Sequence, residues 1–368
     1  MFADNRKISL RQLQALLLLD FFGTTLLFLP GELALCTQNG CWPAAAILGG
    51  LFTAISLLLT TLGKTMPDGT VVQWCRSLLG GIVGNLVLLG LAAKLWLDGA
   101  VELRLFTEVV SRTMLPSTPM WILSLVILLV SGALAAQGME CRGRAAEVLF
   151  FFVAVPLVVI LIAVAISSEY RRVMPLALPQ LKGMAQSLPE MSVVFQGLVF
   201  LYFVFPGLKK PRNGSMPVAV VCFLFTLVLT VIVFLCLAVY GADTLPAKLL
   251  PTLQMMERVS FTGVFLTRLD VILLWFWMAA VTVFLSGTLF FGSLLAVQLC
   301  HQSEGKRKYW LFAILILLFI GGTLPPDFSG AYGLRLNMAP WLNGFYLLGL
   351  PLLLLFLSRV RKGGGANG

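Results

Sequence analysis

Apolar runs of membrane-spanning length recur along the whole chain, separated by short charged or Pro- and Gly-rich segments. A helix needs roughly 20 apolar residues to cross a hydrocarbon core of about 30 Å. Because lipid offers a backbone no hydrogen-bond partners, each run is expected to be a helix. Only 11% of the residues are charged, against about a quarter in soluble domains. The sequence therefore predicts an all-α integral membrane protein.

Ten transmembrane helices are predicted from these runs. The connecting segment 168–191 contains three prolines and divides the helices into five and five, as an internal duplication would. We therefore expect one transmembrane domain, residues 1–368, with repeats at 1–167 and 192–358 and a flexible cytoplasmic tail at 359–368. The charged but periodic stretch 98–113 is expected to continue the third helix or to lie along the outer interface. The predicted helices cover residues 10–30, 42–63, 77–98, 119–137, 146–168, 192–208, 216–241, 266–299, 309–324 and 339–358.

Positive charges set the expected orientation. The stretch MFADNRKISLRQLQ lacks the cleavage site of a removable signal, so the first apolar run is expected to stay in the protein as a helix. Most Lys and Arg residues lie in connecting segments on the same side as this stretch, Arg142 and Arg144 among them, and the positive-inside rule assigns that side to the cytoplasm. Both termini are therefore expected in the cytoplasm. This topology accounts for the net charge of +10, and nucleic-acid binding is not expected.

Two charged residues lie well inside predicted spans, away from the first and last few residues. An ionised side chain costs about 2.5–3.5 kcal/mol at the helix centre. Asp20, in LLLLDFFGTTLLFLPG, is a candidate for binding a cation, a proton or a ligand amino group. The alternatives are a place near the interface, a protonated carboxyl or a structural pair. For Lys94 a local pair with Asp98 and Glu102 is favoured. The other possibilities are that Lys94 replaces a metal cation or pairs with Asp20.

Small residues interrupt the first predicted helix of each half. Gly23, Thr24 and Thr25 follow Asp20 in the first helix, and Gly197 and a Pro-Gly pair lie in the sixth. Interrupted helices at matching positions point to a midplane binding site in transporter-type folds. The open backbone and two hydroxyls at 23–25 would suit a ligand carboxylate, although small residues also serve helix packing in membranes.

The other candidate groups are few. Thr282 and Ser286 share one face of the eighth helix, where they would line an ion or ligand site or bond helix to helix. No nucleotide-binding loop, metal-ligand pair or catalytic triad is present, and His301 is the only histidine. Neither an enzyme, a cofactor nor a metal site is expected. For Cys36 and Cys41, which share a predicted outer loop, a disulfide and two free thiols both stay open.

Three stretches resemble one family. RKISLRQLQALLLLDFFGTTLLFLPG is similar to the opening of the spore germination permeases, the B subunits of nutrient germinant receptors. GMECRGRAAEVLFFF resembles that family's Gly-x-Glu-x-x-x-Arg-x-x-Glu motif before the fifth helix. ERVSFTGVFLTRLDVILLWFWMAAVTVF resembles its Arg-x-Asp followed by a Trp-containing helix. The likeness in motif order, length and span number covers nearly the whole chain.

The resemblance implies a fold and a site. This family is a branch of the amino acid-polyamine-organocation transporters, which implies a five-plus-five inverted repeat with unwound first and sixth helices. It also implies partner A and C subunits, the spore inner membrane and a germinant pocket, usually for an amino acid. This chain departs from the family pattern by having Leu198 and further apolar residues where relatives carry an acidic group, which favours a ligand such as alanine, valine or leucine. Carried over by position, the pocket residues are Gly23, Thr24, Thr25, Gly197, Leu198 and Thr282 or Ser286.

The leading hypothesis is therefore nutrient sensing. An amino-acid-like germinant would bind at the midplane and stabilise one state of the bundle, and partner subunits would relay the change. The alternatives are an amino-acid permease in which Asp20 or Lys94 couples transport to protons or ions, and a transport-inactive scaffold for the partner subunits.

Overall fold

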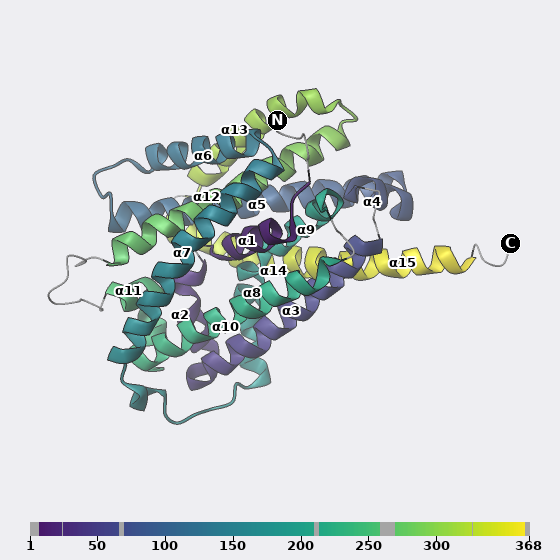
Figure 1. Ribbon diagram of the computed structural model, residues 1–368. Coiled ribbons are helices and arrows are strands. Elements are labelled where there is room, and N and C mark those ends of the chain that lie inside the picture. Colours follow the sequence, from purple (N-terminus) through teal and green to yellow (C-terminus); the bar gives the residue numbers. More distant parts are fainter. Residues whose placement is uncertain are drawn as a thin grey trace.

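The computed structural model describes residues 7–23, 25–65, 70–209, 213–257, 269–325 and 327–364, and of residues 269–273, 276 and 361–364 the backbone alone. These residues form a bundle of packed helices (Figure 1). The helices are α1 (Leu10–Phe21), α2 (Thr25–Thr37), α3 (Cys41–Thr65), α4 (Val71–Leu79), α5 (Gly81–Thr113), α6 (Met120–Ala136), α7 (Met139–Ser167), α8 (Leu181–Val194), α9 (Leu201–Val204), α10 (Ser215–Tyr240), α11 (Pro251–Glu257), α12 (Leu269–Leu299), α13 (Arg307–Thr323), α14 (Phe328–Asn343) and α15 (Leu350–Gly364).

The predicted all-α membrane fold is confirmed. In the described part of the chain, five helical stretches are long and apolar enough to cross a membrane, and a bent pair of helices makes a sixth. Each of the ten predicted regions contains a helix. The stretch 98–113 continues the third predicted helix as part of α5. The division into two repeats stays a prediction.

The first predicted helix is broken where the sequence indicated. A capping box between Ser9 and Gln12 starts α1, and the chain leaves the helical region at Phe22, with φ −76° and ψ 51°. After Gly23 the chain becomes helical again as α2. Thr24, a predicted site residue in this break, lies outside the described residues.

The sixth predicted helix begins earlier than expected. We predicted 192–208, but α8 starts at Leu181 and bends by 52° into the stretch 196–207, so half of the expected linker is helical. In the part of α8 that lies in the expected linker, the buried residues are Gly183, Ser187, Glu190 and Met191. Because most of them are small or polar, hydropathy does not reveal this part of the helix.

The predicted C-terminal tail is also wrong in part. The last helix was predicted at 339–358, but α14, a π-helix at Gly344–Gly349 and α15 follow one another from Phe328 to Gly364. Residues 359–364, assigned to a flexible tail, are therefore helical.

Short helix α1 lies at the centre of the bundle, against α7, α10 and α12. Helix α3 runs along α10, and Gly49 allows their close approach. A Cβ at Gly49 would lie 2.3 Å from Cγ2 of Thr226, whose hydroxyl donates to the carbonyl of Cys222 at 2.8 Å. Thr226 is thus held in place and cannot turn away.

We predict that Gly49→Ala lowers the stability of the protein, because overpacking in a fixed contact costs about 1–3 kcal/mol. The matched control is Gly50→Ala on the same helix, where a Cβ meets nothing within 4 Å. Removing glycine there is expected to stabilise slightly. Thermal unfolding of both variants in one detergent measures the difference, and equal melting temperatures would contradict the prediction.

Candidate ligand site at two broken helices

The two breaks lie against each other. Gly197 belongs to a 3₁₀ turn, η3 (Gln196–Phe200), directly after α8. A Cβ at Gly197 would lie 2.9 Å from Cβ of Asp20 and 3.3 Å from its carbonyl oxygen. Next to this contact the rings of Phe21 and Phe195 are 5.2 Å apart. The structure thus brings together Asp20 and Gly197, two of the predicted site residues.

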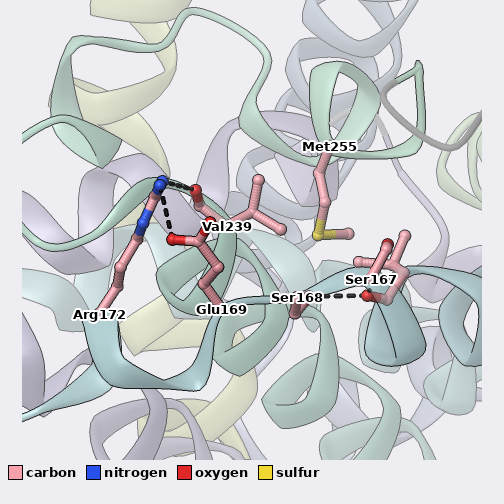
Figure 2. A pocket seen from close by; sticks show the side chains of 7 residues that line it. Ser167, Ser168, Glu169, Arg172, Val239 and Met255 are labelled. Carbon is pink, nitrogen blue, oxygen red and sulfur yellow. Dashed lines mark hydrogen bonds and ion pairs between the residues drawn. The ribbon is translucent and has the colours of Figure 1, made fainter.

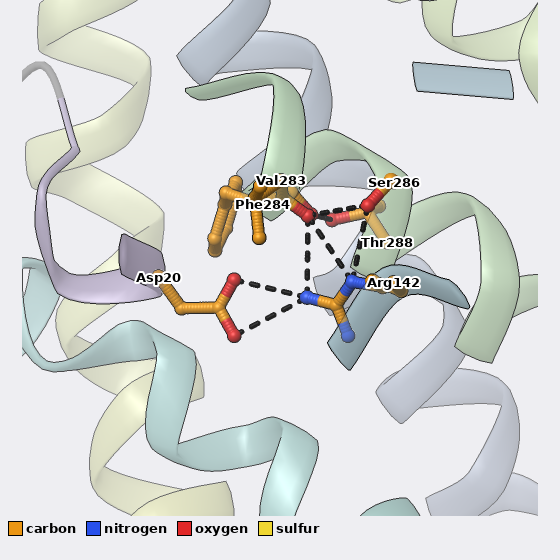
Figure 3. A network of polar contacts seen from close by, with 6 residues as sticks. All are labelled: Asp20, Arg142, Val283, Phe284, Ser286 and Thr288. Carbon is orange, nitrogen blue, oxygen red and sulfur yellow. Dashed lines mark hydrogen bonds and ion pairs between the residues drawn. The ribbon is translucent and has the colours of Figure 1, made fainter. Parts of the chain in front are cut away.

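Asp20 forms a buried ion pair with Arg142 of α7 (Figure 3). Nη2 of Arg142 donates to the two carboxylate oxygens of Asp20 at 3.0 and 3.2 Å. From α12, the carbonyl of Val283 accepts from Nε and Nη2 at 3.3 and 3.2 Å, and Oγ of Ser286 accepts from Nε at 3.0 Å. Asp20 and Arg142 are only 3% and 1% exposed, so the pair ties α1, α7 and α12 together inside the bundle.

The oxygen atoms around Arg142 are of the kind that a monovalent cation would require. The carboxylate of Asp20, the carbonyl of Val283 and the hydroxyl of Ser286 converge on one guanidinium. Its carbon lies 5.4 Å from the ring centroids of Phe200 and Phe291. A side chain at position 287 would collide with it, since a Cβ there would be 2.3 Å from Nη2. The guanidinium of Arg142 thus fills the space between these oxygen atoms, the two aromatic rings and Gly287.

Arg142 corrects the sequence analysis, which placed it in a cytoplasmic segment as a topological charge. Of the alternatives for Asp20, the structural pair is formed, with Arg142. The hypothesis that Lys94 pairs with Asp20 is wrong in this structure. The carboxylate of Asp98 accepts from Lys94, the local pair that was favoured.

A second buried ion pair lies beside the first break. Nη2 of Arg335, on α14, donates to Oε2 of Glu102, on α5, at 3.1 Å. Glu102 is fully buried and Arg335 is 4% exposed. A Cβ at Gly23 would be 3.2 Å from Oε1 of Glu102, so the break leaves its backbone open toward this carboxylate.

Backbone carbonyls at and just after the break have partners on two other helices. The carbonyl of Leu26 lacks its usual partner four residues on because residue 30 is proline. Nε1 of Trp277, on α12, donates to the carbonyl of Gly23 at 3.3 Å. Oγ1 of Thr252, on α11, donates to the carbonyl of Leu26 at 2.9 Å. Such partners are what allows a helix to open at membrane depth.

Several buried polar atoms near the breaks have no hydrogen-bond partner among the described residues. They are Oγ1 of Thr25 after the first break, Oε1 of Gln196 after the second, and Nη1 of Arg335 beside Glu102. An unpartnered buried polar atom costs about 1–3 kcal/mol. These atoms are therefore the groups most ready to receive a polar ligand.

Other predicted site residues have structural roles here. Thr282 donates to the carbonyl of Met278 on its own helix at 2.8 Å. Ser286 donates to the carbonyl of Val283 at 2.7 Å and accepts from Arg142. Leu198 is a fully buried apolar contact in η3. Of the eighth-helix pair, Ser286 joins the buried network directly.

Sequence reasoning gave no site role to Arg142, Arg335 or Gln196, and it named Glu102 only as a local partner of Lys94. The signal for Arg335 was an arginine in the stretch AYGLRLNMAP, between the last two predicted helices. For Arg142 the signal was the motif GMECRGRAAE, where the arginine follows the start of α7 by three residues. Neither stretch of sequence indicates the partner on another helix, which is Asp20 for Arg142 and Glu102 for Arg335.

A small pocket elsewhere has its charges already paired. It lies at the ends of α7 and α10, with a volume of about 150 Å³. Arg172 donates to the carbonyl of Val239 at 2.6 Å and pairs with Glu169 at 2.8 Å (Figure 2). We interpret this cluster as a structural contact that fixes the segment after α7, which carries Glu169 and Arg172, against the end of α10.

The cysteines form no disulfide. Cys36 and Cys41 are both free thiols, as are the other five. In the short helix α4, burial raises the pKa of the Cys75 thiol to about 12. It therefore stays protonated and unreactive at neutral pH.

These features define a multi-pass helical membrane protein with buried charge pairs at two interrupted helices. A model of the family described as "Spore germination protein" matches residues 7–326. The chain belongs to this spore germination permease family. It is 24% identical to spore germination protein YndE of Bacillus subtilis (strain 168), over 99% of both chains. It is 23% identical to spore germination proteins B2 and KB of the same organism, over 98% of this chain and 97% and 96% of theirs.

We predict that Arg142→Met destabilises the protein strongly, because it leaves the carboxylate of Asp20 buried without its partner, which costs about 3–5 kcal/mol. The double variant Asp20→Leu/Arg142→Met is expected to recover most of the loss. Arg144→Met on the same helix is the control: its pair with Glu140 is exposed, and such pairs contribute about 0–1 kcal/mol. Thermal unfolding in detergent measures all three. Equal losses for Arg142→Met and Arg144→Met would show that the buried pair carries no special weight.

Proposed function

We propose that this protein is the membrane subunit of a nutrient germinant receptor, and that an amino-acid-like germinant binds where the two broken helices meet. The observation that carries the proposal is the contact of the two breaks through Gly197 and Asp20, flanked by the unpartnered atoms of Thr25 and Gln196. A ligand there would supply the hydrogen bonds that the protein leaves unmade. Membership of the spore germination permease family supports the proposal that the protein is a receptor subunit.

The groups at the breaks suit a zwitterion. The open backbone at Gly23 faces the carboxylate of Glu102, which can attract an ammonium group. Nη1 of Arg335, unpartnered and buried, can donate to a carboxylate. After the second break, the buried stretch Leu198, Val199 and Phe200 supplies apolar side chains. We therefore propose a small amino acid with an apolar side chain, such as alanine, valine or leucine.

Ligand binding would act by shifting the bundle between two arrangements. A ligand shifts such an equilibrium only by its differential affinity for the two states. Asp20 links α1 to α7 and α12 through Arg142, so a change at the break is transmitted to both helices. We propose that A and C partner subunits in the spore inner membrane relay the change, with both termini of this chain in the cytoplasm.

A second candidate function is an ion- or proton-coupled amino-acid permease. It is favoured by buried charge pairs, Asp20 with Arg142 and Lys94 with Asp98, inside membrane-spanning segments. Uptake of labelled amino acids into proteoliposomes separates the two functions, because sustained accumulation requires transport and receptor action alone does not.

The test of the proposed site is germination of spores with Thr25→Val. This change keeps the side-chain shape but removes the unpartnered hydroxyl. We expect the amino-acid concentration for half-maximal germination to rise about tenfold, as for loss of a hydrogen bond of roughly 1–1.5 kcal/mol. The control is Thr61→Val, whose hydroxyl is exposed and bonded to its own helix. Immunoblots check subunit abundance.

An unchanged response at normal abundance would overturn the placement of the ligand at this break. If partner subunits are also lost from the membrane in Thr25→Val spores, the scaffold function gains support instead.

A further inference from the structure

A separate pocket of about 320 Å³ lies between α2, α14 and the loop that follows α10. We propose that it is a second binding site for the same class of ligand, a free amino acid in its zwitterionic form, situated before the breaks on the side of the membrane away from the N-terminus. Pockets that hold small molecules measure about 300–1,000 Å³. The proposal takes its ligand class from the proposed function, but its groups are distinct from those at the breaks.

Opposite charges line this pocket. Glu32 of α2 supplies a carboxylate, and Lys248, in the loop after α10, supplies an ammonium group. No ion pair joins these two among the described residues. The Lys248 ammonium lies 5.4 Å from the ring centroid of Tyr240, a cation–π distance. Glu32 also faces the hydroxyl of Tyr332 in the same lining. The pocket thus presents two side chains of opposite charge, as the two charges of an amino acid require.

Three aromatic rings belong to the apolar part of the lining, together with Pro246, Ala247 and Leu249. Phe28 meets Tyr332 edge to face, with centroids 4.9 Å apart, and Phe328 at 6.0 Å. The rings of Phe328 and Tyr332 stack at 6.1 Å. Such a set accommodates an apolar side chain, and its ring faces also attract an ammonium group. An amino acid with an apolar side chain therefore matches both the charged and the aromatic walls.

Glycine at position 31 shapes the pocket. A Cβ there would lie 3.3 Å from the carbonyl oxygen of Leu245 and 3.6 Å from that of Lys248. The loop therefore rests directly on α2, which brings the Lys248 backbone next to the turn of helix that carries Glu32.

Residues that line the pocket are close in sequence to residues at the first break. Tyr332, in its lining, is one helical turn from Arg335, which pairs with Glu102 beside Gly23. Phe28, also in the lining, follows Gly23 by five residues on the same side of the break. The pocket and the Glu102–Arg335 pair therefore share helix α14, and the pocket and the first break share helix α2.

The test uses a cysteine reporter at the pocket. Ser329 lines the pocket and is exposed, so Ser329→Cys gives a thiol whose labelling rate with a maleimide can be followed. The background carries Cys36→Ser, Cys141→Ser and Cys300→Ser, which removes the thiols that are not buried. The full-length protein in lipid nanodiscs is labelled with and without alanine, valine or leucine at up to 100 mM. The probes for specificity are the amino alcohol leucinol, which lacks the carboxylate, and 4-methylpentanoate, which lacks the amine.

We expect at least one of the three amino acids to slow labelling at least threefold, and neither probe that lacks one charge to do so. Glu32→Gln and Lys248→Met should each abolish the protection, whereas Asp243→Asn, an exposed charge in the same loop outside the lining, should keep it. Thermal unfolding confirms that each variant is folded.

Thr25→Val in the reporter background separates this proposal from the proposed function. Protection that persists in Thr25→Val and vanishes in Glu32→Gln supports a separate pocket, whatever the germination result. Protection that vanishes in Thr25→Val but persists in Glu32→Gln and Lys248→Met would overturn it, because the signal would then come from the break. Failure of all three amino acids to protect, or equal protection by leucinol, would overturn it as well.

Discussion

The ion pair between Asp20 and Arg142 is the interaction on which the arrangement of the bundle depends. Two opposite charges are kept out of water only when geometry and further hydrogen bonds compensate for the desolvation. Here α12 supplies those bonds through Val283 and Ser286. Space for the pair depends on two glycines, since a Cβ at Gly197 or Gly287 would collide with Asp20 or Arg142. This one ion pair thus explains why glycine stands at position 197 in η3 and at position 287 in α12. It also explains why α1 lies against both elements.

Stability and binding capacity are in tension at the breaks. Trp277 bonds the carbonyl of Gly23 at the first break, and Thr252 bonds that of Leu26, which Pro30 leaves without its helical partner. These bonds keep the exposed carbonyls tolerable in a membrane. The hydroxyl of Thr25 and the amide oxygen of Gln196 are nevertheless left without partners among the described residues. A structure selected only for stability would replace such atoms with apolar ones. Their retention at the point where two broken helices meet is the physical basis for placing a ligand there.

Local patterns in the sequence were sufficient for part of this picture. Each of the ten apolar runs contains a helix, Gly23 located the first break, and the i,i+4 spacing of Lys94 and Asp98 gave their pair. Interactions across the bundle were not predictable in this way. Asp20 and Arg142 are 122 residues apart, and Arg142 resembles any cytoplasmic charge next to a helix start. Helix α8 was missed because its buried face, with Ser187 and Glu190, lacks the apolar stripe by which helices are recognised.

The two proposed sites share their supporting helices, which has a mechanical consequence. Helix α2 carries Glu32 and Phe28 at the outer pocket and begins at the first break, while α14 carries Tyr332 at the pocket and Arg335 at the ion pair with Glu102. An amino acid bound between Glu32 and Lys248 would therefore contact the same helices whose positions set the geometry around Gly23. Occupancy of one site would change the affinity of the other, and by linkage the effect is reciprocal. On the two proposals together, an amino acid in the pocket between α2 and α14 would act on the helices around Gly23 without itself reaching the break.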